Sequence, residues 1–160
     1  MAGSRGPRIV VGVTDSVGSR WALAWAVGTA RRTGHPLRVV TALPAATRAE
    51  YALVTEQEHR HAAHALVTAL IAEVCGGVPA DVPIERLVVV DTPGRALVRA
   101  AGSVDLLVIG STGRLTGPTR RYCARRTHCP LVVVPRPDVE DLLGSQLKPA
   151  GRSSRSRDAR

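Results

Sequence analysis

Apolar positions along the chain follow two spacings that alternate with each other. Five short blocks rich in Val, Leu and Ile are bounded by turn residues, which is typical of buried strands. The strands predicted in this way are residues 8–14, 36–42, 83–90, 104–109 and 130–134. Apolar residues at helical spacing predict helices over residues 20–32, 49–75, 93–101 and 120–127. Ser19 is expected to cap the first helix, and Gly34 to end it.

This alternation of strands and helices predicts an α/β fold with a five-stranded parallel sheet and helices on both faces. The doubly wound rule gives the strand order 3-2-1-4-5. Ligands bind such sheets outside the carboxyl ends of the strands, at the point where the strand order reverses. Here that point lies between the first and fourth strands, so the loop after Thr14 is expected beside the loop after Ile109.

Composition limits the number of domains and the compartment. The chain has 160 residues, with no Phe, two Trp and two Tyr, so one domain with an aliphatic core is expected. We predict a disordered N-terminus over residues 1–7, the domain over 8–135 and a basic disordered tail over 136–160, with a helical turn at 139–143. No apolar run approaches the ~20 residues that span a bilayer, which predicts a cytoplasmic protein without a membrane partner.

A formal charge of +9 favours an anionic partner in general. Most of this charge is Arg, however, and the accompanying excess of Ala, Val and Gly favours a coding bias as its origin. The tail arginines could hold nucleic acid loosely through phosphates. No aromatic side chain accompanies them, so nucleic acid is not an expected partner. These tail residues are Arg152, Arg155, Arg157 and Arg160.

The main chemical signal is a glycine-rich loop over residues 110–119, which follows a strand and precedes a helix. Glycines let the backbone approach a ligand, and free N–H groups at a helix start attract phosphate. Arg114, Arg120 and Arg121 add positive charge, whereas Pro118 removes one N–H donor. The other interpretation is a tight turn whose glycines serve backbone geometry alone, and the residues leave both open.

The segments 8–42, 105–113 and 122–135 resemble the universal stress protein family, and the resemblance covers residues 8–135. Nucleotide-binding members of that family carry Gly-x-x-Gly, nine residues, and then Gly-Ser or Gly-Thr. Gly110 and Gly113 match the first pair, but the position nine residues on is Cys123. An alignment from the C-terminal side places Gly117 at the last glycine, in a loop six residues shorter, with Thr119 or Thr116 replacing the missing hydroxyl.

The resemblance also implies an adenine site and an ATP or other adenine-nucleotide cofactor. Asp15 at the end of the first strand would be the polar contact, although another alignment puts Thr14 there. Asp15 is equally a candidate turn or capping residue. The full set of expected nucleotide-binding residues is Val13, Thr14, Asp15, Ala42, Ile109, Gly110, Gly113, Arg114, Gly117 and Thr119.

Other reactive side chains do not form a recognisable set. His61 and His64 could share a helix face, but a third zinc ligand is not evident. The three cysteines lack metal-ligand or disulfide spacing and are expected to be small buried residues. Since no nucleophile lies in a Gly-x-Ser-x-Gly context, we expect no catalytic residues and no enzymatic turnover.

The resemblance further implies a stress-response homodimer. Its subunits would pair through the last strand, at Leu131, Val132, Val133 and Val134. Such an apolar edge strand needs covering, which agrees with pairing. The leading hypothesis is a protein that binds adenine nucleotide and acts through dimerisation and partner contacts. The alternatives are a member that binds partners without nucleotide, a nucleotide-hydrolysing enzyme, and a nucleic-acid accessory protein that uses the tail.

Overall fold

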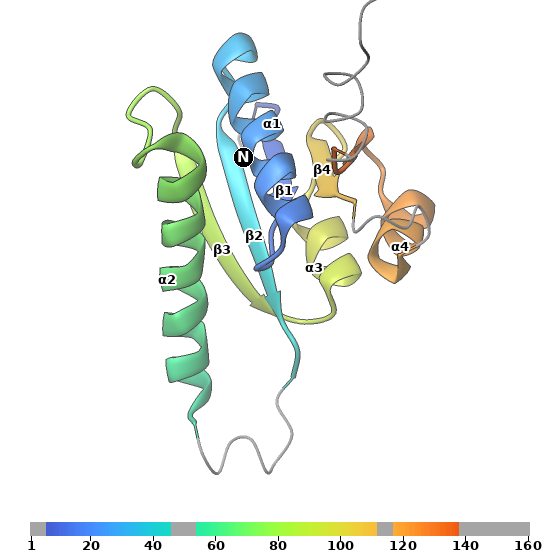
Figure 1. Cartoon of the computed structure of the whole chain (residues 1–160). Helices are drawn as coiled ribbons and strands as arrows, with labels where there is room; N and C mark the ends of the chain where they lie inside the picture. The colour runs from blue at the N-terminus through green and yellow to red at the C-terminus, as the bar shows by residue number, and fades with distance from the viewer. Residues whose placement is uncertain (1–5, 46–53, 112–116, 138–160) are drawn as a thin grey trace, which may run out of the picture.

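A parallel sheet of five strands runs through the centre of the computed structural model, which describes residues 6–45, 54–111 and 117–137 (Figure 1). The strands are β1 (Ile9–Gly12), β2 (Leu37–Leu43), β3 (Ile84–Val90), β4 (Leu106–Gly110) and β5 (Leu131–Val134). Their order is β3-β2-β1-β4-β5, with Val11 opposite both Val39 and Val108. The predicted fold class and strand order are therefore confirmed.

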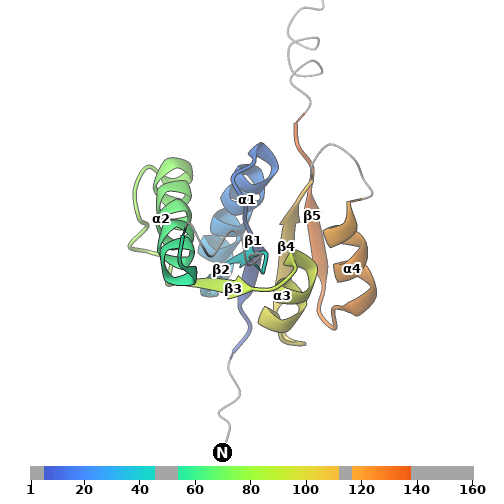
Figure 2. The ribbon, with the colours of Figure 1, turned by 90° about the horizontal axis from the view of Figure 1, so that it is seen from below.

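Four helices cover the two faces of this sheet (Figure 2). The helices α1 (Val17–Thr33) and α2 (Glu56–Cys75) pack on one face, and α3 (Pro93–Ala100) and α4 (Pro118–Arg126) pack on the other. Side chains alternate between the faces along each strand. Val11 thus joins the cluster under α1 and α2, while Val10 joins the cluster with Leu97 and Cys123. We call these two sets of helices the α1/α2 layer and the α3/α4 layer.

The helices of the α1/α2 layer begin and end on capping residues. Ser16 caps α1, because its side chain accepts a hydrogen bond from the backbone N–H of Ser19, so the prediction of Ser19 as the cap was wrong. Thr55 caps α2 in a reciprocal pair with Glu58. The predicted start of this helix at residue 49 lies outside the described residues, and the helix begins at Glu56. Both helices end at left-handed glycines, Gly34 and Gly76.

The helices of the α3/α4 layer have neither kind of cap. Each has proline near its first position, and neither Thr92 nor Gly117 makes a side-chain capping hydrogen bond. Pro118 and Thr119, predicted as loop, belong to α4. The fixed φ of proline suits the first helical position, where a backbone N–H would lack an intrahelical partner in any case.

None of the described helices is long and apolar enough to cross a bilayer. The predicted tail beyond Pro137, with its helical turn at 139–143, lies outside the described residues.

Candidate functional site

The loops after β1 and β4 meet in direct backbone contact where the strand order reverses. A Cβ atom at Gly18 would overlap the carbonyl oxygen of Ser111, and a Cβ at Gly110 would overlap the carbonyl of Gly18. Ser111 in turn donates its N–H to the carbonyl of Val134, with an N···O distance of 2.8 Å. These contacts join the start of α1 to the ends of β4 and β5. The glycines at 18 and 110 therefore permit a close crossing that side chains would prevent.

Hydroxyl groups fill the turn between β1 and α1. The Ser19 hydroxyl accepts the N–H of Thr14 at 2.9 Å and lies 3.0 Å from the Ser16 hydroxyl. Thr14 Oγ1 lies 3.2 Å from both of these oxygens. Because the three hydroxyls bond to one another and to the backbone, they fix the shape of the turn.

Asp15 follows Thr14 but points to a different partner. One of its carboxylate oxygens lies 3.1 Å from Nη1 of Arg20, whose Nε lies 2.8 Å from Glu73 of α2. These hydrogen bonds, first to Glu73 and then to Asp15, raise the pKa of Arg20. The Asp15 side chain is 66% exposed, so its present role is a surface ion pair at the start of α1.

A small hollow opens beside this crossing, between the end of β4 and the start of α4. Its volume is about 130 Å³, and it is lined by Ile109, Gly110, Ser111, Gly117, Pro118, Thr119, Arg120 and Val133. The first-turn N–H groups of a helix have no intrahelical acceptor. Since no side chain of the described residues caps α4, the N–H groups of Thr119 and Arg120 are available to an anion. We call this cavity the α4 hollow.

The other predicted nucleotide contacts are placed apart. Val13 is 3% exposed and packs under α1, while Ala42 packs in the cluster on the opposite face. The N–H of Val13 binds the carbonyl of Val40, and its carbonyl accepts the Thr41 hydroxyl at 3.2 Å. The structure thus gathers Ile109, Gly110, Gly117 and Thr119 but does not place Val13 and Ala42 on one surface. Gly113 and Arg114 lie outside the described residues.

A model of the universal stress protein family matches residues 7–135. The chain belongs to this family. None of the curated proteins matches it. Its fold is similar to that of UspA from Lactobacillus plantarum, at 20% identity and a TM-score of 0.62, with 82% of this chain and 99% of that one covered.

Two further solved structures are similar to this universal stress protein. One is a universal stress protein in complex with cAMP, with 26% identity, a TM-score of 0.59 and coverage of 82% of this chain and 98% of the other. Another is the universal stress protein from Archaeoglobus fulgidus in complex with dAMP, with 20% identity, a TM-score of 0.56 and coverage of 80% and 97%.

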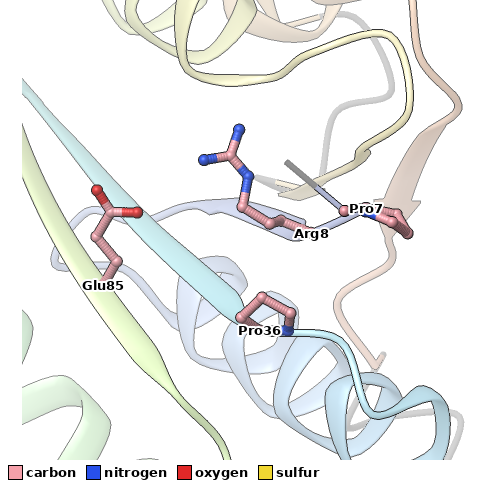
Figure 3. A pocket seen from close by; sticks show the side chains of 5 residues that line it. Pro7, Arg8, Pro36 and Glu85 are labelled. Atoms are coloured by element: carbon pink, nitrogen blue, oxygen red, sulfur yellow. The ribbon is translucent and has the colours of Figure 1, made fainter. Parts of the chain in front are cut away.

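A second hollow of this universal stress protein lies at the opposite, amino ends of the strands (Figure 3). Its volume is about 460 Å³, and Pro7, Arg8, Pro36 and Glu85 line it with Gly6. Arg8 donates from Nη2 to Asp105, and Arg38 donates from Nε to Glu85, at 3.0 and 2.8 Å. These charged groups already join neighbouring strand ends, so we assign them to the fold.

The remaining reactive groups of this universal stress protein do not extend the site. Among the described residues, no group of three or more His, Cys, Asp and Glu could hold a metal ion. Burial raises the pKa of the Cys123 thiol to about 11, so this thiol is unreactive at neutral pH. Cys123 and Cys129 are buried as expected, whereas Cys75 is only partly buried.

Four residues that line the α4 hollow were absent from the predicted nucleotide-binding set, namely Ser111, Pro118, Arg120 and Val133. Arg120 was noted only as positive charge beside the glycine-rich loop, although a cation three residues after a glycine cap lies in the first turn of the helix. Val133 could not be found from the sequence, because its contribution depends on the pairing of β5 with β4.

Proposed function

We propose that this universal stress protein binds an adenine nucleotide with a single phosphate group, and that the phosphate occupies the α4 hollow. The observation that carries the proposal is the start of α4, which has no side-chain cap among the described residues, and whose N–H groups and Arg120 lie at a hollow beside the reversal point of the sheet. Helix N-termini attract phosphate through these N–H groups and the helix dipole. The complex of the 26%-identical relative with cAMP supports an adenine nucleotide as the ligand.

The size of the α4 hollow favours one phosphate over three. About 130 Å³ is well below the ~300 Å³ at which sites for whole organic ligands begin. The nucleoside would therefore lie outside the hollow, over the loops that follow β1 and β4. Thr119 would supply a hydroxyl to the phosphate, in the role that the sequence resemblance assigned to it.

Calorimetry with AMP, cAMP, ADP and ATP tests this proposal. We expect AMP and cAMP to bind at least as tightly as ATP, and Arg120→Gln to weaken AMP binding about tenfold, because a hydrogen bond to a charged group is lost. Arg121→Gln is the matched control, since it removes the same charge at the next position but does not line the hollow. Equal effects of the two variants, or no heat with any nucleotide at millimolar concentration, would contradict the proposal. The second result would favour a member that acts through protein partners alone.

We propose further that the protein binds and does not turn over its nucleotide. The unreactive Cys123 thiol and the hydroxyls committed to the turn after β1 support this view. Incubation with ATP and measurement of released phosphate is the test. Release that Arg120→Gln abolishes and Arg121→Gln leaves intact would establish an enzyme instead.

The edge of the sheet at β5 supports the expected homodimer. β5 pairs with β4 on one side only, and Leu131, Val132 and Val133 are half-buried. An apolar edge strand of this kind is stabilised when a second copy covers it. We expect a dimer in light scattering and a monomer for Leu131→Lys, whereas Val90→Lys on the other edge strand leaves the mass unchanged. A monomeric wild-type protein would contradict the dimer. A stress-response role in the cytoplasm belongs to the same proposal.

A further inference from the structure

The helix α4 carries a charge that the rest of the described structure does not balance. Its nine residues include four arginines and no carboxylate. Arg121, Arg125 and Arg126 are exposed, and none of the ion pairs between described residues involves them. On the other face, Arg20 and Arg31 both bind carboxylates. Arg32, Arg86 and Arg136 also make no ion pair among the described residues, but α4 alone gathers several unpaired arginines on one short helix.

The arrangement of these arginines works against the helix itself. Arg121 and Arg125 are four residues apart, so two like charges share one helix face. Arg120 and Arg121 also lie near the N-terminus, where the helix dipole disfavours cations. The neighbouring helix α3 gives no relief, because its two arginines, Arg95 and Arg99, share the single carboxylate of Asp91. An external anion would offset both unfavourable terms, the repulsion between like charges and the unfavourable dipole.

An aromatic ring lies among these charges. Tyr122 is 36% exposed, and the guanidinium carbon of Arg126 lies 5.9 Å from its ring centroid. The absence of a side chain at Gly94 of α3 makes room for this tyrosine, since a Cβ there would lie 2.9 Å from the tyrosine Cβ. The packing of α3 against α4 thus holds the ring in place while part of it faces solvent.

We propose that the exposed face of α4, formed by Arg121, Tyr122, Arg125 and Arg126, binds single-stranded nucleic acid. The arginines would contact successive phosphates, because guanidinium groups bind phosphate oxygens in a bidentate manner. An unpaired base would stack on Tyr122 or on the guanidinium of Arg126, as bases do on aromatic and arginine side chains in single-strand sites. An acidic protein would satisfy the charges but would leave the ring unused. This face is separate from the α4 hollow, so the inference does not depend on the nucleotide.

Fluorescence anisotropy with the full chain tests this inference, using labelled oligo(dT) and oligo(U) of about 16 nucleotides. We expect both strands to bind at low salt, more tightly than a duplex of the same length and more tightly than polyglutamate. The double variant Arg121→Gln/Arg125→Gln should weaken binding about tenfold and lower the slope of log K against log salt by about 0.7 for each phosphate that the variant no longer neutralises. The double variant Arg31→Gln/Arg32→Gln removes the same charge from α1 and should change the affinity little.

The stacking contribution has its own test. Tyr122→Leu should weaken binding about fivefold or more, whereas Tyr122→Phe keeps the ring and the affinity. Thermal unfolding of both variants establishes that α4 is still packed. Four results would overturn the inference: equal losses in the two arginine double variants, no loss in the α4 variant, equal binding of polyglutamate, or equal binding of duplex and single strand. No loss in the α4 variant would assign binding to the tail, and equal binding of polyglutamate would make the face a site for an acidic protein.

Discussion

The helices of the α1/α2 layer have capping residues at both ends, whereas the helices of the α3/α4 layer begin without side-chain caps. Side chains cap the starts of α1 and α2 and left-handed glycines end them, but α3 and α4 have neither device. Charges follow the same division. The first two helices carry four arginines and three glutamates, and the last two carry six arginines and no carboxylate. Free N–H groups and unpaired cations are what anions bind. We therefore expect the α1/α2 layer to contribute mainly to stability and the α3/α4 layer to supply groups that an anion can bind.

The largest effect is expected where the α1/α2 layer meets the loop after β4. Gly18→Ala would force a methyl group into the Ser111 carbonyl, and a backbone atom cannot rotate away. We expect a loss of about 3 kcal/mol in the free energy of unfolding. Gly28→Ala is the control within the same helix, because its Cβ would meet only Arg32 Nη1 at 3.5 Å. That variant should stabilise the protein by about 1 kcal/mol. Similar urea midpoints for the two variants would show that the crossing is not tight.

The next effect concerns the buried carboxylate in the turn between α3 and β4. The Asp105 side chain is 1% exposed and accepts hydrogen bonds from the N–H groups of Arg8 and Gly102 and from the Arg8 guanidinium. Asp105→Asn would leave the Arg8 charge without its partner, at a cost of about 3 kcal/mol. Denaturant unfolding measures this loss. A change below about 1 kcal/mol would mean that solvent replaces the pair.

The same group predicts the response of stability to acid. Burial acts to raise the pKa of Asp105, but the hydrogen bonds from Gly102 and Arg8 outweigh it, so the net pKa is lowered. The unfolded chain then binds this proton more readily than the folded chain does. The contribution is present above the ordinary carboxyl pKa of about 3.9 and is lost as pH falls through the lower folded value. Asp105→Asn should flatten this part of the acid unfolding profile.

Two threonine variants measure how much the capping position contributes to stability in each layer. Thr55→Ala removes the cap of α2 and its reciprocal bond with Glu58, and it should cost about 1 kcal/mol. Thr92→Ala alters the corresponding position of α3, where no capping bond exists, and should cost only a few tenths. Thermal unfolding measures both. Equal losses would show that the two layers do not differ in this respect.

The smallest change in the free energy of unfolding is expected at Gly117, where one substitution should raise stability and lower the affinity for AMP. A side chain at Gly117 meets nothing within 4 Å, so Gly117→Asp would place a capping carboxylate at the free N–H groups of α4. We expect a gain of a few tenths of a kcal/mol and a clear loss of AMP binding, because the carboxylate occupies the phosphate position. Gly117→Ala leaves those groups open and should keep the affinity in calorimetry. Unimpaired AMP binding by the aspartate variant would place the phosphate elsewhere.

The strand order was predictable from the sequence because it depends on short apolar blocks and the handedness of their connections. The helix starts were less predictable. Around the start of α1, three hydroxyl residues lie within six positions, and the one that caps the helix is Ser16, which places Gly18 inside the first turn against Ser111. The predicted loop over residues 110–119 included Pro118, which instead occupies the first turn of α4.

The glycines of the candidate site were easier to predict than the ion pairs that hold the surrounding fold. Gly110 and Gly117 could be located by motif, since glycine beside a helix start has a local meaning. The ion pair of Arg8 with Asp105 joins residues 97 positions apart and has no local signal. For Asp15 the sequence indicated a role that the structure does not show. Its position after the first strand suggests a ligand contact, but its carboxylate forms an ion pair with Arg20.

The contact of Gly18 with Gly110 also gives the molecule a built-in optical probe. A ligand that moves Gly110 or Ser111 is expected to disturb the first turn of α1, because both residues contact Gly18, and Trp21 lies three residues beyond Gly18 with 47% of its surface in solvent. The chain has only two tryptophans, Trp21 and Trp25, and both are on this helix. Occupancy of the loop is therefore expected to change the emission wavelength of unlabelled protein, which allows its kinetics to be followed by stopped flow.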